Sequence, residues 1–255
     1  MLSRWLVAGL LLPALGCGTA TRAQPEELSD PGPRDAAANL ALELDGVDDY
    51  ASIGTARVPQ IMRDQTVLLW FRPEGAERGA DQGLQSLFTL RRSDWSGFAI
   101  ALDQDVPLAY NVFGPRDLAR ASEAAVLGAW HHLAFVVTAS ASTLYLDGAL
   151  AGTGAAPATN RTPTQAFIGT LDGYSAFFHG GLDELRLYDR AFSSEEVAAV
   201  AAGTKPSEGE PLVLYLPFDE ASGARSYDRS GLGNHAELGD DVPAAMPERV
   251  RADLP

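Results

Sequence analysis

The chain has 255 residues, of which 46% are hydrophobic, and carries a formal net charge of −15 at neutral pH. All-β sandwiches of this length commonly form a single domain around one large core. The acidic balance argues against a protein that tracks nucleic-acid phosphates with a basic surface, and it disfavours adsorption to an anionic membrane. We therefore expect one acidic globular domain whose partners do not include nucleic acid.

The N-terminus has the layout of an export signal. Arg4 precedes an apolar run, Trp5 to Leu15, that is too short to span a bilayer. The only cysteine, Cys17, follows this run in a context that resembles a bacterial lipobox. We expect residues 1–23 to be a signal segment, with cleavage before Cys17 and lipidation of that cysteine. The resemblance implies an exported protein of the bacterial cell envelope, an outer-membrane lipoprotein that meets the membrane only through this anchor. Ordinary cleavage after Ala23 is the alternative.

Residues 24–39 are rich in proline and acidic residues and lack apolar periodicity, so we expect a flexible linker. From Leu40 onward the pattern changes to short strands. Residues 98–102 alternate large apolar side chains with alanines, the period of two that indicates a strand with one buried face. The runs at 67–71 and 133–137 are almost continuously apolar and predict central strands covered on both sides. Together these segments predict two packed antiparallel sheets.

One short helix is expected near residues 193–202. Ser193 and Glu196 have the spacing of a capping box, the residues that follow are mostly good helix formers, and Gly203 can end the helix.

Four segments, in order, resemble laminin-G-like jelly rolls of the concanavalin A-like lectin/glucanase superfamily. They are Leu42 to Tyr50, Val67 to Pro73, Trp130 to Val137 continuing into Leu144 to Gly148, and Gly181 to Val197. The resemblance implies an all-β, two-sheet antiparallel jelly-roll sandwich over residues 40–250. It also implies a binding module and names no particular ligand.

The C-terminal part resembles the opening of such a domain, although it comes last here. Residues 212–223 and 228–238 carry the likeness. One explanation is a circularly permuted domain in which residues 206–250 supply the usual opening strand. The other is the start of a truncated second domain. We favour permutation, because the termini of compact domains often lie close together.

The resemblance also implies a structural calcium ion. In calcium-binding relatives the aspartate equivalent to Asp183 looks toward oxygen ligands from the opening strand. The corresponding residues here are Asp219, Glu220, Gly223 through its carbonyl, Asp228 and Asn234. Such oxygen ligands suit Ca²⁺. The alternative is that Asp183 accepts hydrogen bonds from backbone N–H groups and holds no ion.

Several expected loops place aromatic residues beside polar ones, as a sugar-binding surface requires. The candidate ligand-binding residues are Asp94, Trp95, Tyr110, Asn111 and Tyr174. The alternative is that these aromatic rings fold back onto the core.

We therefore predict a non-catalytic extracytoplasmic module that binds a carbohydrate or glycoconjugate at the cell surface. The first alternative is an envelope structural or adhesion protein with a protein partner. The second is a glycoside hydrolase, since Glu43, Asp45 and Asp48 superficially resemble the acidic triad of laminarinase-type enzymes. A retaining hydrolase needs two carboxyl groups facing each other across the sugar bond. The sequence identifies no such pair, so we expect no enzyme.

Overall fold

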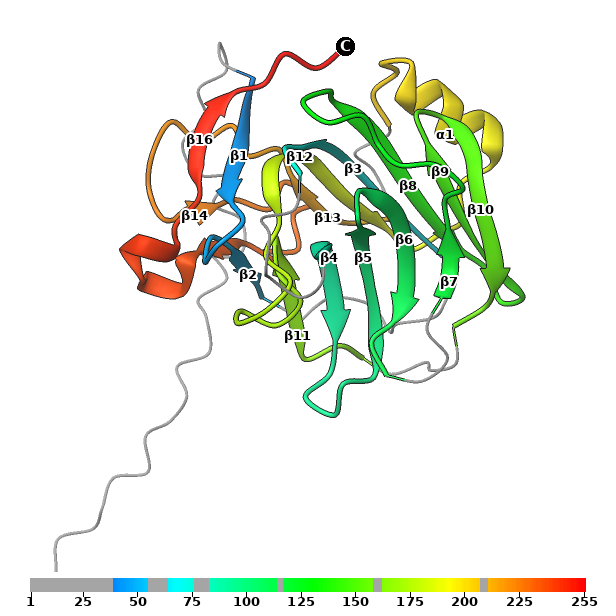
Figure 1. The fold of residues 1–255 in the computed structure, drawn as a ribbon, viewed down its shortest axis with the longest axis horizontal. Helices are drawn as coiled ribbons and strands as arrows, with labels where there is room; N and C mark the ends of the chain where they lie inside the picture. Colours follow the sequence, from blue (N-terminus) through cyan, green and yellow to red (C-terminus); the bar gives the residue numbers. More distant parts are fainter. Residues whose placement is uncertain (1–38, 55–63, 76–82, 114–116, 158–161, 207–210) are drawn as a thin grey trace, which may run out of the picture.

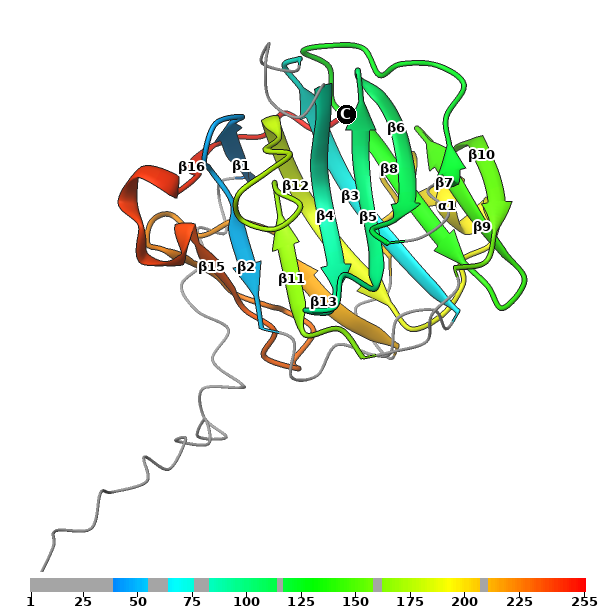
Figure 2. The same ribbon diagram turned by 60° about the horizontal axis from the view of Figure 1, so that its bottom comes forward.

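The computed structural model describes residues 39–54, 64–75, 83–113, 117–157, 162–206 and 211–255. In these ranges two antiparallel sheets pack face to face (Figures 1 and 2). Each sheet has eight strands. The predicted all-β jelly-roll sandwich is confirmed. The signal segment, Cys17 and the linker up to residue 38 lie outside the described residues and stay predictions.

The first sheet is built around two central strands, β3 (Gln65–Pro73) and β8 (His131–Val137), which are buried on both faces as their apolar runs predict. Its strand order is β10 (Ala149–Ala155), β9 (Ala141–Leu146), β8, β3, β12 (His179–Tyr188), β1 (Leu40–Asp45) and β16 (Glu248–Arg251). An eighth strand, β13 (Leu212–Leu216), also pairs with β12.

The second sheet also has eight strands. Its order is β14 (Arg225–Ser226), β15 (Ala236–Leu238), β2 (Ala51–Ile53), β11 (Gln165–Ile168), β4 (Leu84–Arg91), β5 (Gly97–Asp103), β6 (Val106–Asn111) and β7 (Asp117–Arg120).

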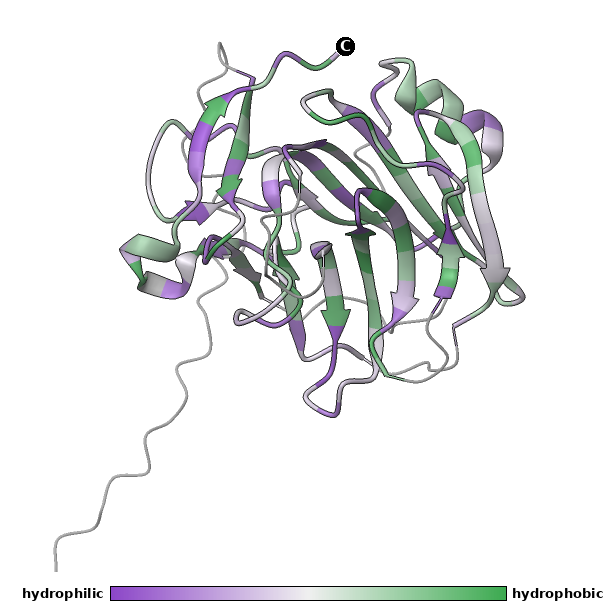
Figure 3. Ribbon diagram, viewed as in Figure 1, coloured by the Kyte–Doolittle hydropathy of each residue, from purple (hydrophilic) through white to green (hydrophobic). Residues whose placement is uncertain are grey.

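The main core fills the space between the sheets, and hydrophobic residues recur along the strands of both (Figure 3). Its largest fully buried side chains include Phe71, Phe88, Phe135 and Phe178. Burial of one such side chain contributes roughly 1.5–3 kcal/mol. This core holds the strands rigidly enough to position the loops and outer faces.

The helix α1 (Ser194–Ala201) covers the outer face of the first sheet, where Val197 and Val200 join a second apolar cluster with Leu68 and Tyr188. Its predicted capping box is present: the Glu196 N–H donates to Ser193 Oγ at 3.2 Å, and the Ser193 N–H donates to Glu196 Oε2 at 2.8 Å. Two short 3₁₀ turns, Gly239–Asp241 and Pro243–Ala245, follow β15. Among the described residues, no helix is long and apolar enough to cross a membrane.

The C-terminal segment supplies strands to both sheets. β13 pairs with the second half of β12, β15 with β2, and β16 with β1. β1 and β13 share one edge of β12, with Leu42 opposite Leu182 and Leu216 opposite Leu185. Residues 212–251 therefore belong to the same two sheets as residues 40–188.

Candidate functional site

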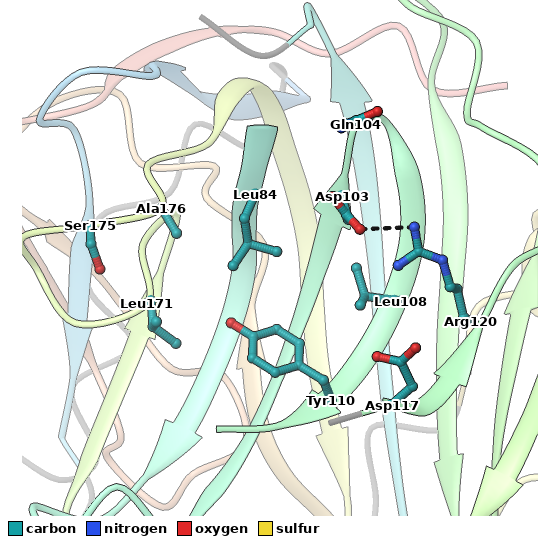
Figure 4. Close-up of a pocket in the computed structure, with 10 residues that line it drawn as sticks. All are labelled: Leu84, Asp103, Gln104, Leu108, Tyr110, Asp117, Arg120, Leu171, Ser175 and Ala176. Carbon is teal, nitrogen blue, oxygen red and sulfur yellow. Dashed lines mark hydrogen bonds and ion pairs between the residues drawn. The ribbon is translucent and has the colours of Figure 1, made fainter. Parts of the chain in front are cut away.

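An open groove of about 600 Å³ lies on the outer face of the second sheet, over β4 to β7. The face follows from the alternation in β5, because Phe98, Ile100 and Leu102 enter the core between the sheets while Ala99 and Ala101 point the other way. The groove is lined by Leu84, Asp103, Gln104, Leu108, Tyr110, Asp117, Arg120, Leu171, Ser175 and Ala176 (Figure 4).

The floor of the groove is apolar. Ala99 and Ala101 cluster there with Leu108 and Tyr110, and Leu171 packs against them from the loop that follows β11. Small alanine side chains at the centre of the sheet leave room above β5, which hollows the surface. Figure 4 shows the ring of Tyr110 in the middle of this hollow. Tyr110 is 8% exposed, so only a small part of its ring reaches the groove, where it adds to the apolar surface that can contact the C–H face of a sugar ring.

The walls of the groove are polar. Arg120 Nη2 on β7 lies 2.9 Å from Asp103 Oδ2 at the end of β5, so the ion pair reaches across β6 (Figure 4). Both side chains are more than one third exposed, at 38% and 37%. Asp117 is exposed and has no ion-pair or hydrogen-bond partner among the described residues. The groove therefore combines an apolar floor with fixed donors and acceptors.

The structure brings one of the five predicted ligand-binding residues, Tyr110, into this groove. Asn111 follows it on β6, opposite Phe98, and is directed to the other side of the sheet. Tyr174 is 89% exposed, and its loop contributes Leu171 and Ser175 to the groove wall.

Asp94 and Trp95 lie together in the turn between β4 and β5. The Arg91 guanidinium lies 4.0 Å from the centre of the Trp95 ring, and Asp94 Oδ1 accepts hydrogen bonds from the N–H and hydroxyl of Ser96. Trp95 is 41% exposed, so one part of its ring remains available to a partner.

Asp183 lies where β1 stops pairing with β12 and β13 begins. Its side chain is fully buried; Oδ1 accepts the Glu184 N–H at 2.7 Å, and Oδ2 has no hydrogen-bond partner among the described residues. Burial, with repulsion from Glu184 and Asp219, raises the pKa of Asp183 well above its ordinary value. Asp219 is also buried, and its Oδ1 accepts the Leu40 N–H at 3.1 Å. A buried carboxylate oxygen without a donor, beside a second carboxylate, fits a cation such as Ca²⁺.

Glu220 and the carbonyl of Gly223 face guanidinium groups. Arg249 Nη1 donates to the Gly223 carbonyl at 2.7 Å, and Arg249 Nη2 lies 3.8 Å from Glu220 Oε2. Arg229 Nη2 lies 3.8 Å from the other Glu220 oxygen, which also accepts the Tyr227 N–H at 2.9 Å. Glu220 therefore lies between two guanidinium groups, Arg249 from β16 and Arg229 from the segment after β14, although its Oε2 has no hydrogen-bond partner among the described residues.

Asp228 and Asn234 organise the loop between β14 and β15. The two carboxylate oxygens of Asp228 accept backbone N–H groups of Tyr215, Ser230 and Asn234 at 2.8–3.0 Å. The Asn234 amide donates to the Val213 carbonyl at 3.1 Å. The six predicted calcium ligands are thus divided in this structure. Asp183 and Asp219 lie together, Glu220 lies between two guanidinium groups, and the Gly223 carbonyl, Asp228 and Asn234 bond to protein groups.

The acids that resemble a hydrolase triad serve other contacts. Glu43 forms a bidentate pair with Arg72 at 2.8 and 2.9 Å. Asp45 Oδ1 accepts the N–H groups of Val47, Asp48 and Asp49, as expected of a turn residue. Carboxylate oxygens of Asp45, Asp48 and Asp49 lie within 4.8 Å of one another. Burial, together with the charge of Asp45, raises the pKa of Asp49 to about 6.

This raised pKa gives a pH prediction. The folded state binds the Asp49 proton more tightly than the unfolded chain, whose pKa is near 3.8, so the stabilisation is full below that pH and is lost as pH rises through about 6. Asp49→Asn keeps an oxygen that can accept the Asp45 N–H. Its free energy of unfolding, relative to that of the wild type, should be higher at pH 7 than at pH 4. Chemical unfolding of both proteins at the two pH values, with a chelator present, measures this difference. An equal difference at both pH values would contradict the prediction.

Fold and groove together define a jelly-roll sandwich with an open groove on one outer face. A family model described as the concanavalin A-like lectin/glucanase superfamily matches residues 45–198, and the chain belongs to this superfamily. The family expected from the four sequence segments is therefore confirmed. No curated protein matches the chain.

Two solved structures share the fold at low sequence identity. A Bacteroides ovatus protein assigned to carbohydrate binding aligns with a TM-score of 0.65 and 15% identity over 85% of this chain and 60% of its own. The present chain thus spans less than two thirds of that protein. Domain 4 of an extracellular arabinanase from Geobacillus stearothermophilus, solved with arabinotriose, aligns with a TM-score of 0.51 and 20% identity, over 63% of this chain and 76% of its own.

Most of the residues that line the groove were not predicted from the sequence. Asp103, Asp117 and Arg120 lie at the ends of short strands and belong to no motif. The available signal was their position on the strand face opposite to the large apolar residues. That signal becomes specific only when the order of β5, β6 and β7 is known.

Proposed function

We propose that this protein is a non-catalytic glycan-binding module and that the groove over β4 to β7 is its binding site. The observation that carries the proposal is the composition of the groove, where the Tyr110 ring and an apolar floor lie beside Asp103, Asp117 and Arg120. Its volume of about 600 Å³ falls within the roughly 300–1,000 Å³ of small-ligand sites.

Binding follows from the chemistry of these groups. The C–H face of a sugar ring packs on Tyr110 and the leucines, while sugar hydroxyls donate to the carboxylates and accept from the Arg120 guanidinium. Charge-assisted hydrogen bonds of this kind are about twice as strong as neutral ones. The carbohydrate-binding assignment of the Bacteroides protein and the arabinotriose complex of the arabinanase domain, which share the fold, make arabinan a sensible first probe.

We further propose that the protein acts outside the cytoplasm, in the cell envelope. This part rests on the N-terminal sequence, in which an apolar segment ends at Cys17 and provides for export and a lipid anchor. Residues 24–38 then provide a tether between the anchor and the sandwich.

Arg120→Ala should weaken glycan binding about 10- to 100-fold. A hydrogen bond to a charged group contributes about 1.5–3 kcal/mol, and each 1.4 kcal/mol is about tenfold in affinity. A polysaccharide array identifies the ligand, and calorimetry with that ligand measures the change. Arg225→Ala is the matched control, because it removes a second exposed ion pair, to Glu237 at 2.6 Å, outside the groove. Equal binding by both variants would remove the groove from the proposal.

Calcium would act as a structural ion at Asp183 and Asp219, where it neutralises two buried carboxylates. Added Ca²⁺ should therefore raise the thermal unfolding midpoint of the wild type, because a ligand that binds only the folded state stabilises it. Asp183→Asn should abolish this rise. Asp48→Asn, in the more exposed acidic cluster, should keep it. A calcium response that survives Asp183→Asn would refute the assignment.

A glycoside hydrolase is the alternative that one observation favours, because two carboxylates, Asp103 and Asp117, line the same groove. Hydrolysis would need them on opposite sides of a glycosidic bond. Release of reducing ends from a bound polysaccharide, lost in Asp117→Asn, would establish this alternative. If no glycan binds and envelope proteins co-purify instead, the protein-binding alternative replaces both.

A further inference from the structure

Among the described residues that line the groove, the charged side chains are two acids, Asp103 and Asp117, and one base, Arg120. The single base is already paired, since its guanidinium lies 2.9 Å from Asp103. Asp117 is left as a carboxylate without a partner among the described residues. The lining therefore carries a formal charge of −1, and its one cation is neutralised by the protein itself.

Among the described residues, the elements around the groove supply no free base to compensate this charge. Asp105 lies in the turn between β5 and β6, and Asp172 lies in the loop that forms the groove wall. Arg91, a described base on β4, is only 5% exposed, lies 4.0 Å from the centre of the Trp95 ring, and is attracted to Asp172. The described residues around the groove therefore include two further acids and one base, and this base is buried and already in contact with Trp95. The whole chain has a net charge of −15.

These charges discriminate between classes of glycan. Sugar hydroxyls donate hydrogen bonds to carboxylates and need no counter-charge. A carboxylate, sulfate or phosphate on the glycan would instead meet Asp117 without a cation to receive it, and like charges brought together oppose binding. Recognition of anionic groups depends on arginine or lysine that is free to engage them.

We propose that the groove selects uncharged polysaccharides and rejects glycans that carry carboxylate, sulfate or phosphate groups. This inference rests on the proposed glycan-binding function and adds the chemical class of the ligand. Asp117 determines the selectivity, and the Asp103–Arg120 pair serves as a neutral hydrogen-bonding wall.

The test uses polymers that share a backbone and differ in charge: dextran and dextran sulfate, and hydroxyethylcellulose and carboxymethylcellulose. In any pair that binds, the neutral member should bind at least tenfold more tightly. Its affinity should be the same at 50 and 500 mM NaCl, because no ion pair is there to be screened. Tighter binding of the charged member, weakened by salt, would overturn the selectivity and leave the glycan-binding function intact. Failure to bind any polymer in the panel or on the array would refute both the selectivity and the glycan-binding function.

Charge reversal at one position sharpens the test. Asp117→Lys, on an exposed strand end, should increase the affinity for the anionic polymers at least tenfold and make it salt-dependent. Asp253→Lys changes the net charge by the same amount at another exposed position, outside the groove, and should leave the preference unchanged. Equal gains in both variants would show that net charge alone controls binding and would refute the role of Asp117.

Discussion

Removal of residues 206–255 should leave an insoluble protein without a cooperative unfolding transition. The deletion exposes the edge of β12, which then presents unpaired backbone groups, and it removes β16 from β1 and β15 from β2. It also removes buried side chains from the main core, among them Leu214, Leu216 and Phe218. Each contributes roughly 1.5–3 kcal/mol, whereas whole domains are stable by only about 5–15 kcal/mol.

Solubility after expression and thermal unfolding followed by circular dichroism measure the effect. Deletion of residues 253–255, which follow β16, is the matched control and should fold normally. Co-expression of residues 206–255 as a separate chain should restore soluble protein, because the missing strands can pair in trans. A soluble, cooperatively unfolding truncation would contradict the permuted single domain and favour a truncated second one.

Glu220→Ala should lower the free energy of unfolding by about 3–5 kcal/mol, since it leaves two guanidinium groups buried without their shared carboxylate. Glu220 is fully buried, and the Arg229 and Arg249 side chains are only 12% and 8% exposed. Glu237→Ala breaks an exposed pair with Arg225 and should cost less than about 1 kcal/mol. Urea unfolding of the two variants compares them directly.

The same experiment separates two roles for Glu220. If the carboxylate of Glu220 neutralises the two arginines, Glu220→Gln should lower the free energy of unfolding. The variant should still be stabilised by Ca²⁺ to the same extent as the wild type. Loss of the calcium response in Glu220→Gln would instead return Glu220 to the metal ligands expected from the family resemblance. Equal costs for Glu220→Ala and Glu237→Ala would contradict the buried ion cluster itself.

Local patterns predicted the strands and the helix start because their causes are local. Alternation at 98–102 indicates a strand with one buried face, and the continuous apolar runs indicate strands with two buried faces. Ser193 and Glu196 cap the helix through contacts between residues three positions apart. Family resemblance over a few conserved-looking segments then placed these strands in a jelly roll. Tyr110 was expected in a loop, as an aromatic residue beside a polar one, whereas it lies within β6.

The remaining site residues could not be found this way, because strand pairing brings them together across the chain. Asp103 and Arg120 meet across β6, and Arg249 reaches the Gly223 carbonyl from β16. The amino-acid order thus specified the family, the sandwich and the acidic character of the surface. Which carboxylates pair with arginine, which one faces the groove, and which two lie together in the core depend on strand register, since a shift of one residue turns each side chain to the opposite face.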